Sequence, residues 1–250
     1  MLAVGAVLAG SAGGWVWAPY SDIVTRLVPG QQRPRTLAII TTGTSSGLVA
    51  LGGLALLAAA GSWRLVWVGV ALAAVVAAAL NLRLVPRTRP GPHPEGRHGV
   101  SSLARALRLP AAYSVVYFAV VVICFTYAAE VLDDGDLPAA AVAALYATIG
   151  VTGVLAVTTG ALVQRPGSLR VAALCLVTVA AASALLRPAG DSPVATAASA
   201  CVFGAGYMTG SAVLAVWTAE LVPDRASAAF TGCLVVGAVA RSRRRPSPAR

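Results

Sequence analysis

The feature that most constrains this chain is a set of long apolar runs. A helix needs roughly 20 consecutive apolar residues to cross the hydrocarbon core of a bilayer. Seven runs of about that length lie at residues 2–20, 37–60, 65–85, 111–132, 139–163, 169–187 and 193–220. An eighth, at residues 226–240, is too short for a comfortable span. The runs predict an all-α integral membrane protein, a polytopic bundle of seven transmembrane helices with a short eighth helix.

The composition excludes a soluble domain. Of the 250 residues, 58% are hydrophobic and 11% are charged, whereas ordinary globular chains carry about 25% charged residues. The net charge of +10 comes from 19 arginines against nine acidic residues, without any lysine. Basic residues beside hydrophobic spans act as topology determinants on the anionic cytoplasmic face of a membrane. We therefore expect a lipid bilayer as the partner of this chain and no binding of nucleic acid.

Residue types that carry catalysis or bind metals do not converge in the sequence. The four cysteines lie singly in apolar runs, and both histidines lie in one polar loop. Residues 43–47 match the G-x-S-x-G motif around Ser45, but a serine hydrolase needs a strand–turn–helix elbow with a histidine and an acid nearby. Here the motif lies inside an apolar run. We expect no metal site, no cofactor and no enzyme activity.

The distribution of arginine predicts how the chain crosses the membrane. Twelve arginines lie in or beside the loops that follow the first, third, fifth and seventh runs. The alternate loops hold only Arg64, Arg187 and an acidic run at residues 133–136. Cytoplasmic loops carry an excess of basic residues. We predict a multi-pass protein of the plasma membrane with its N-terminus outside and the 86–109 loop in the cytoplasm.

One long polar segment divides the chain. Residues 87–108 combine proline, glycine and arginine, a composition that does not form a packed core. The sequence therefore predicts three helices of an N-terminal bundle at residues 1–85 and a cytoplasmic linker at 86–110. A C-terminal bundle follows at 111–240, and a basic disordered tail at 241–250.

The loop after the fifth run resembles a signature of major facilitator superfamily transporters. The family's cytoplasmic loop reads glycine, three residues, an acid, a basic residue, any residue, glycine and then further basic positions. Gly160, Arg165, Gly167 and Arg170 match this order, and Gln164 stands where the acid is usual. In the family the signature follows the second helix and, in weakened form, the eighth. The loop here is similar to the weakened copy.

Alignment of this loop with the weakened copy also aligns the other apolar runs with helices of the family. The seven runs then resemble the family's helices 4 to 10, and residues 226–240 resemble the start of helix 11. Trp63-Arg64 resembles the dipeptide that opens the family's sixth helix, and residues 223–225 resemble the loop before its eleventh. The glycines of the second run only partly resemble the antiporter motif, because Leu48 replaces its proline. The resemblance implies an incomplete fold of this family, from a truncated or frame-shifted chain.

The resemblance also implies where a substrate binds. The family's helices 4, 7 and 10 line its cavity, and the first, fourth and seventh runs correspond to them. Their aromatic and polar residues are the substrate-cavity candidates Trp15, Trp17, Tyr117, Thr126, Tyr207 and Thr209. Aromatic residues near span ends can instead be interfacial anchors, and this alternative stays open.

Ionisable residues lie only at the membrane edges of the runs. Asp22, Glu130 and Glu220 each fall about a turn from the end of a run. Intramembrane ionisable residues are costly and usually functional, but none of these three lies at the midplane. Proton coupling is therefore left open.

The sequence favours a secondary active transporter that moves a small solute. By resemblance, the loop containing Gly160, Gln164, Arg165, Gly167 and Arg170 forms a cytoplasmic gate. Arg165 is expected to be its most important remaining contact, and Gly167 to adopt a positive φ in a tight turn. The two arginines can instead be topology anchors only. The rival functions are a non-transporting membrane protein fragment and a membrane-embedded enzyme, which would need a convergent acid, base or nucleophile.

Overall fold

The computed structural model describes residues 20–59, 64–85, 100–133, 140–186 and 192–242, and every regular element in these ranges is helical. The α-helices are α2 (Arg33–Ala59), α3 (Arg64–Leu84), α4 (Val100–Asp133), α5 (Ala141–Gly153), α6 (Thr159–Gln164), α7 (Ser168–Leu185), α8 (Pro193–Leu221) and α9 (Ala226–Ser242). Short 3₁₀ segments are η1 (Gly30–Gln32), η2 (Val154–Thr158) and η4 (Pro223–Arg225). Residues 20–27 are also helical.

Six of the described helical segments are long and apolar enough to cross a membrane. They run over Gly30–Leu57, Arg64–Leu84, Ser102–Leu132, Ala141–Gln164, Ser168–Leu185 and Pro193–Leu221. These segments match the second to seventh predicted spans and confirm the all-α polytopic fold. The first predicted span, residues 2–20, lies outside the described residues apart from Tyr20.

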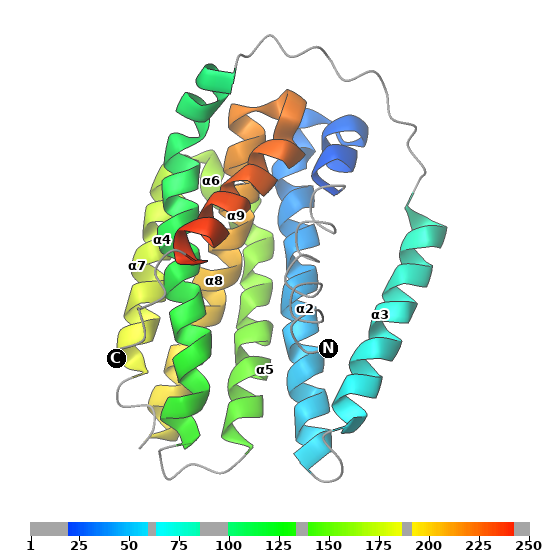
Figure 1. The fold of residues 1–250 in the computed structure, drawn as a ribbon, viewed down its shortest axis with the longest axis vertical. Coiled ribbons are helices and arrows are strands. Elements are labelled where there is room, and N and C mark those ends of the chain that lie inside the picture. Colours follow the sequence, from blue (N-terminus) through cyan, green and yellow to red (C-terminus); the bar gives the residue numbers. More distant parts are fainter. Residues whose placement is uncertain (1–19, 60–63, 86–99, 134–139, 187–191, 243–250) are drawn as a thin grey trace, which may run out of the picture.

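Helix α8 is the centre of the bundle. It packs against α7, α5, α2, α9 and α4. Of its most apolar stretch of 18 residues, 72% is buried inside the protein. Helix α3 is the opposite case, because none of the residues in its most apolar stretch is buried. Figure 1 shows α3 beside α2 and tilted away from the other helices. Both helices are apolar on every face, so contact with neighbouring helices, rather than composition, distinguishes the enclosed helix from the peripheral one.

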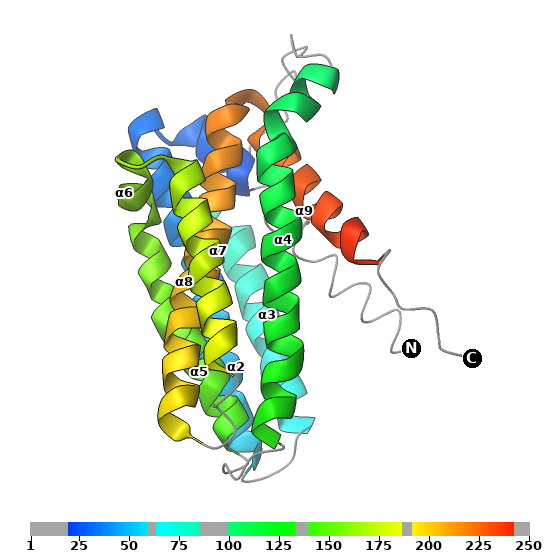
Figure 2. The same cartoon turned by 90° about the vertical axis from the view of Figure 1, so that its left-hand side faces the viewer.

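Helix α2 connects the two predicted bundles. It belongs to the first three predicted spans, yet its most extensive packing is against α5, with further contacts to η2, α6 and α8. On the other side of α8, helix α4 packs against α9 and α7 (Figures 1 and 2). The described helices therefore form one continuous bundle with the α2–α5 contact inside it.

The start of α4 differs from the predicted linker. Residues 86–99 lie outside the described residues, but residues 100–110 form the first turns of α4. Pro110 lies inside this helix and is fully buried. A proline inside a helix removes one hydrogen bond and crowds the carbonyl four residues earlier. Leu103 and Leu107 share the face of Pro110 at helical spacing. Packing of this face explains why the helix continues through a proline that the sequence analysis placed at the end of a linker.

The fifth predicted span is not one regular helix. Helix α5 ends at Gly153, five residues follow in 3₁₀ conformation, and α6 begins at Thr159. The Thr158 and Thr159 hydroxyls donate to the carbonyls of Leu155 at 2.7 Å and Ala156 at 2.6 Å. Such local bonds compete with regular helical hydrogen bonding. Hydropathy detects the span but not this change of helix type within it.

Most arginines of the described chain gather at one end of the bundle. Figure 1 shows the start of α2, the start of α4, the turn between α6 and α7 and the end of α8 at its upper end. The arginines on these elements, in the η4 segment that follows α8 and in the adjoining 20–27 helix are Arg26, Arg33, Arg35, Arg105, Arg108, Arg165, Arg170 and Arg225. The arginines that alternate between loops in the sequence therefore lie together at one end of the folded bundle.

Helix α9 is short, as its apolar run predicts. It has 17 residues, crosses α4 obliquely and ends part way along the bundle (Figure 2). The Ser114 hydroxyl of α4 donates a 2.9 Å hydrogen bond to the carbonyl of Cys233 on α9. Of the predicted tail 241–250, the first two residues belong to α9 and the rest lie outside the described residues.

Candidate functional site

A cluster of tyrosines joins α4 to α8. Tyr117 is completely buried, and its hydroxyl donates to the carbonyl of Tyr207. Tyr113 donates from its hydroxyl to the carbonyl of Gly210 at 3.2 Å, and the two α4 rings stack with centroids 5.1 Å apart. Offset stacking of aromatic rings adds to the energy of their burial. Both hydroxyls thus reach backbone acceptors on the facing helix inside the membrane span.

The aromatic cluster continues toward α5. The ring of Tyr207 stacks on Phe203 at 5.7 Å and meets the edge of Phe125 at 5.4 Å. Phe125 in turn stacks on Tyr146 of α5 at 5.7 Å, whose hydroxyl donates to the Phe125 carbonyl at 3.4 Å. Three helices therefore contribute to one aromatic row. Its half-buried members are Phe125, Tyr146 and Tyr207.

The structure separates the predicted cavity residues into three groups. Tyr117 and Tyr207 lie together, with centroids 6.5 Å apart, and Thr209 is half-buried on the same helix as Tyr207. Thr126 is exposed on α4 and takes no part in the aromatic row. Trp15 and Trp17 lie outside the described residues. Of the candidates that the structure describes, Tyr207 is the half-buried one within the aromatic row.

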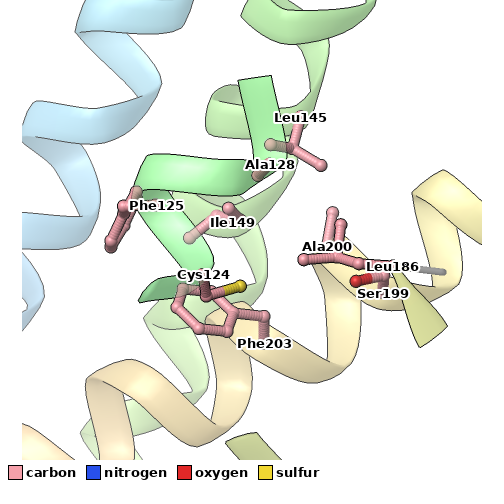
Figure 3. A pocket seen from close by; sticks show the side chains of 9 residues that line it. All are labelled: Cys124, Phe125, Ala128, Leu145, Ile149, Leu186, Ser199, Ala200 and Phe203. Carbon is pink, nitrogen blue, oxygen red and sulfur yellow. The ribbon is translucent and has the colours of Figure 1, made fainter. Parts of the chain in front are cut away.

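A small void lies beside this row. Its volume is about 10 Å³, which is of the order of one water molecule. Figure 3 shows apolar side chains from α4, α5 and α8 around it, together with the Cys124 sulfur and the Ser199 hydroxyl. That hydroxyl already donates to the Ala182 carbonyl at 2.9 Å. The void is a packing gap rather than a binding site for a solute.

The signature loop lies between α6 and α7. Gly160 is buried against the start of α2, where a Cβ on it would lie 2.9 Å from the backbone nitrogen of Arg35. Gly167 has φ of 83°, the positive value expected for it, and precedes the first residue of α7. Gln164, Arg165 and Arg170 are all exposed. The two glycines shape the loop, and the polar side chains remain at its surface.

Glu220 lies next to this loop in space. Its Oε2 accepts a 2.6 Å hydrogen bond from the hydroxyl of Ser168, the residue that follows Gly167. Glu220 also lines a cavity of about 220 Å³ between the start of α2 and the end of α8. Arg33 lines the same cavity, and its guanidinium donates to the carbonyls of Val28 at 2.9 Å and Thr25 at 2.6 Å. Glu220 therefore bonds to the residue that follows Gly167 of the loop and shares a cavity with Arg33 of α2.

Of the other two membrane-edge carboxylates, Glu130 lies at the opposite end of the bundle from the loop, and Asp22 lies in the 20–27 helix near Arg33. Asp22 is half-buried in the 20–27 helix, and Glu130 is exposed near the end of α4. The distance of Glu130 from the arginine-rich end follows from its place at the opposite end of α4 (Figure 2). Of the three, Glu220 is the one with a described hydrogen bond to the residue that follows Gly167 of the loop.

The sequence gives no reason to single out Ser168 or Arg33 as site residues, whereas Glu220 is already one of its membrane-edge candidates. Ser168 and Glu220 are 52 positions apart, and Arg33 joins them only through the fold. Ser45 was considered only as a hydrolase nucleophile, but it lies in the middle of α2 and is fully buried. The sequence signal nearest to Ser168 is Gly167, which precedes it in the loop.

Comparison with known proteins agrees with this architecture. A model of the Major Facilitator Superfamily matches residues 1–240, a range that contains all six candidate spans and the loop between α6 and α7. No curated protein and no solved structure matches the chain. The family match confirms the predicted resemblance, and with the helical bundle described above it identifies a membrane transporter of this type. The chain belongs to the major facilitator superfamily.

Proposed function

We propose that the chain is a secondary active transporter that moves a small solute across the plasma membrane. The observation that carries the proposal is the α2–α5–α8 contact, where helices from both sides of the polar 86–99 segment pack together. Transporters built from two such halves work by rocking one half against the other around a site near the midplane. The family assignment supports the transport class, and the α2–α5–α8 contact supplies the place where two halves meet.

The aromatic row is the proposed recognition surface for the solute. Tyr207 and Thr209 of α8 and Phe125 of α4 are half-buried, and none carries a charge. Ligand sites are commonly apolar and aromatic, with a few polar groups that fix orientation. We therefore expect a solute with an aromatic or apolar body, oriented by hydroxyl and backbone groups rather than by an ion pair.

Ligand-induced stabilisation tests this recognition surface. The purified chain is heated with tetraphenylphosphonium, benzoate or tryptophan, which represent an apolar cation, an aromatic anion and a zwitterion. A ligand at 100 times its dissociation constant stabilises a protein by about 2.7 kcal/mol, so a bound solute raises the melting temperature by several degrees. Tyr207→Ala should abolish the shift measured from the variant's own unliganded midpoint. Tyr127→Ala should preserve it, because Tyr127 is 54% exposed. Equal shifts in both variants would reject the surface.

The gate loop gives a second prediction. With Gln164 in place of the usual acid, Arg165 is the proposed cytoplasmic contact between the two halves. Exposed ion pairs and contacts with helix ends contribute roughly 0.3–1 kcal/mol, which biases two states without locking either. Arg165→Ala should therefore reduce solute uptake into proteoliposomes a few-fold, while abundance and membrane insertion stay normal.

Arg83→Ala is the matched control for Arg165. Arg83 is also exposed, but it lies at the end of α3, outside the gate loop. Uptake by this variant should equal that of the parent chain. If Arg165→Ala and Arg83→Ala behave alike, both arginines act only as topology signals.

The orientation of the chain is a third prediction. The excess of arginine at one end of the bundle supports a cytoplasmic location for that end, with Met1 and residues 133–136 outside. A single cysteine is introduced in place of Ser101 or Asp134 in a chain whose four cysteines are replaced. A membrane-impermeant maleimide applied to intact cells should label position 134 and leave position 101 unlabelled. External labelling at position 101 would reverse the predicted topology.

A further inference from the structure

Ser45 is an unusual residue at the contact between α2 and α5. Its side chain is completely buried. Ser45 Oγ is one of two buried side-chain oxygens without a hydrogen-bond partner in the described part of the chain. Buried polar groups are nearly always hydrogen-bonded, and an exception needs an explanation. The cost of such a group is larger inside a membrane protein, where bulk water is absent.

Neighbouring hydroxyls on α2 do not share this property. Thr41 and Ser46 donate to the carbonyls of Leu37 at 2.9 Å and Thr42 at 3.2 Å, the usual solution for a hydroxyl within a helix. Thr42 donates to the Ile39 carbonyl at 2.6 Å. Ser45 is therefore unpaired because of its particular surroundings, rather than because α2 lacks acceptors in general.

Those surroundings are a tight three-helix junction. A Cβ on Gly153 of α5 would lie 2.7 Å from Ser45 Oγ and 2.5 Å from Cγ of Met208 on α8. Atoms at such distances leave no room for a water molecule between Ser45 and Gly153. The absence of a side chain at position 153 is thus what allows the two helices to meet over the unpaired hydroxyl.

The α5 side of the junction is also where the helix changes type. Gly153 is the last residue of α5, and the 3₁₀ segment η2 begins at Val154. Stretches of 3₁₀ conformation within a helix often mark a hinge. An unpaired hydroxyl on one helix and a change of helix type on its partner therefore meet at one point.

We propose that Ser45 is a hydration-sensitive switch that biases α2 and α5 toward separation. When the helices are packed, the hydroxyl is dry and unpaired. When they part next to the η2 hinge, water reaches the hydroxyl and satisfies it. The unpaired hydroxyl raises the free energy of the packed state but not that of the separated state. Ser45 therefore raises the population of the separated state. The role of the switch in transport rests on the proposed function. The packed and separated states themselves do not, because they are defined without a solute.

Hydrogen–deuterium exchange of the chain in lipid nanodiscs tests the switch directly. Exchange of the amides at residues 146–158 reports how often this contact opens. Ser45→Ala removes the unpaired hydroxyl and should slow their exchange by between about 5-fold and 150-fold. Ser46→Ala is the matched control, because its exposed hydroxyl is already paired, and its exchange should equal that of the parent chain. Equal exchange in the two variants, or faster exchange in Ser45→Ala, would overturn the proposal.

A second pair of variants should act in the opposite direction. Gly153→Ala places a methyl group against Ser45 and Met208 and should accelerate exchange of the same amides. Gly43→Ala, whose added Cβ would meet nothing within 4 Å, should leave it unchanged. Unaltered exchange of α7 amides in all four variants shows that the bundle is intact. Unchanged exchange at residues 146–158 in Gly153→Ala would also overturn the proposal, whereas failure of solute uptake would count against the transport function alone.

Discussion

Replacement of Gly204 by alanine is expected to lower the free energy of unfolding by about 3 kcal/mol, the upper part of the usual range for overpacking a core. Gly204 is buried in α8, where the helix meets α5. A Cβ at this position would overlap Thr152 Oγ1 and the Ile149 carbonyl oxygen, and would lie 2.9 Å from Ile149 Cα. Two of these atoms belong to the backbone and cannot rotate away, so α8 has to shift. Titration with sodium dodecyl sulfate in mixed micelles measures the loss.

Gly232→Ala is the control for this prediction. Gly232 is an exposed glycine of α9, and a Cβ on it would meet nothing within 4 Å. In a helix the change from glycine to alanine alone stabilises by up to about 1 kcal/mol. The two substitutions are chemically identical but should act with opposite signs. A Gly204→Ala variant as stable as the parent chain would mean that α8 and α5 are less closely packed than described here.

The helical spans could be predicted because the hydropathy of the sequence shows directly how long each apolar run is. The predicted span 193–220 corresponds to α8 (Pro193–Leu221), and the predicted span 169–187 corresponds to α7 (Ser168–Leu185). A run of apolar residues has to be long enough to cross the membrane, and polar loops mark both of its ends. The fold class follows from such runs without any knowledge of contacts between them.

The irregular parts of these spans depend on contacts that composition does not contain. Pro110 indicates a helix boundary when read locally, but in the structure its buried face holds the helix together across it. The 3₁₀ segment after Gly153 lies in an uninterrupted apolar run, so hydropathy does not distinguish it from α-helix. In both places the packing of neighbouring helices decides the local geometry.

The site was harder to predict than the fold, because an apolar helix does not reveal which face is buried. Soluble helices alternate polar and apolar faces, whereas lipid-facing and protein-facing residues of a membrane helix are equally apolar. Thr126 and Tyr117 on α4 were therefore equivalent candidates in the sequence, although one is exposed and the other is completely buried. The contact between Ser168 and Glu220 depends on the folded arrangement of α7 and α8 and had no local signal.

The tyrosine cluster should be the other large determinant of stability. Tyr117→Ala is expected to lower the free energy of unfolding by about 3–5 kcal/mol, the range for removing a large aromatic side chain from a packed core. The Tyr117 ring lies directly against the backbone of α8, since a Cβ on Gly210 would be 2.5 Å from Tyr117 Cε2. It also stacks on Tyr113 and meets the edge of Phe118 at 5.0 Å. Its removal therefore leaves a cavity between α4 and α8.

Tyr117→Phe separates this packing from the hydrogen bond to the Tyr207 carbonyl. The phenylalanine ring keeps the contacts with Gly210, so the variant loses only the hydroxyl's contacts with the Tyr207 carbonyl and, at 3.4 Å, with Ser211 Oγ. An interhelical hydrogen bond averages about 0.6 kcal/mol in a membrane protein. Unfolding titrations should thus rank the variants with Tyr117→Phe close to the parent chain and Tyr117→Ala far below it. Tyr127→Ala, on the exposed side of α4, should change the free energy of unfolding by less than about 0.5 kcal/mol. If Tyr117→Phe costs as much as Tyr117→Ala, the hydroxyl rather than the ring joins α4 to α8, because only the hydroxyl is absent from both variants.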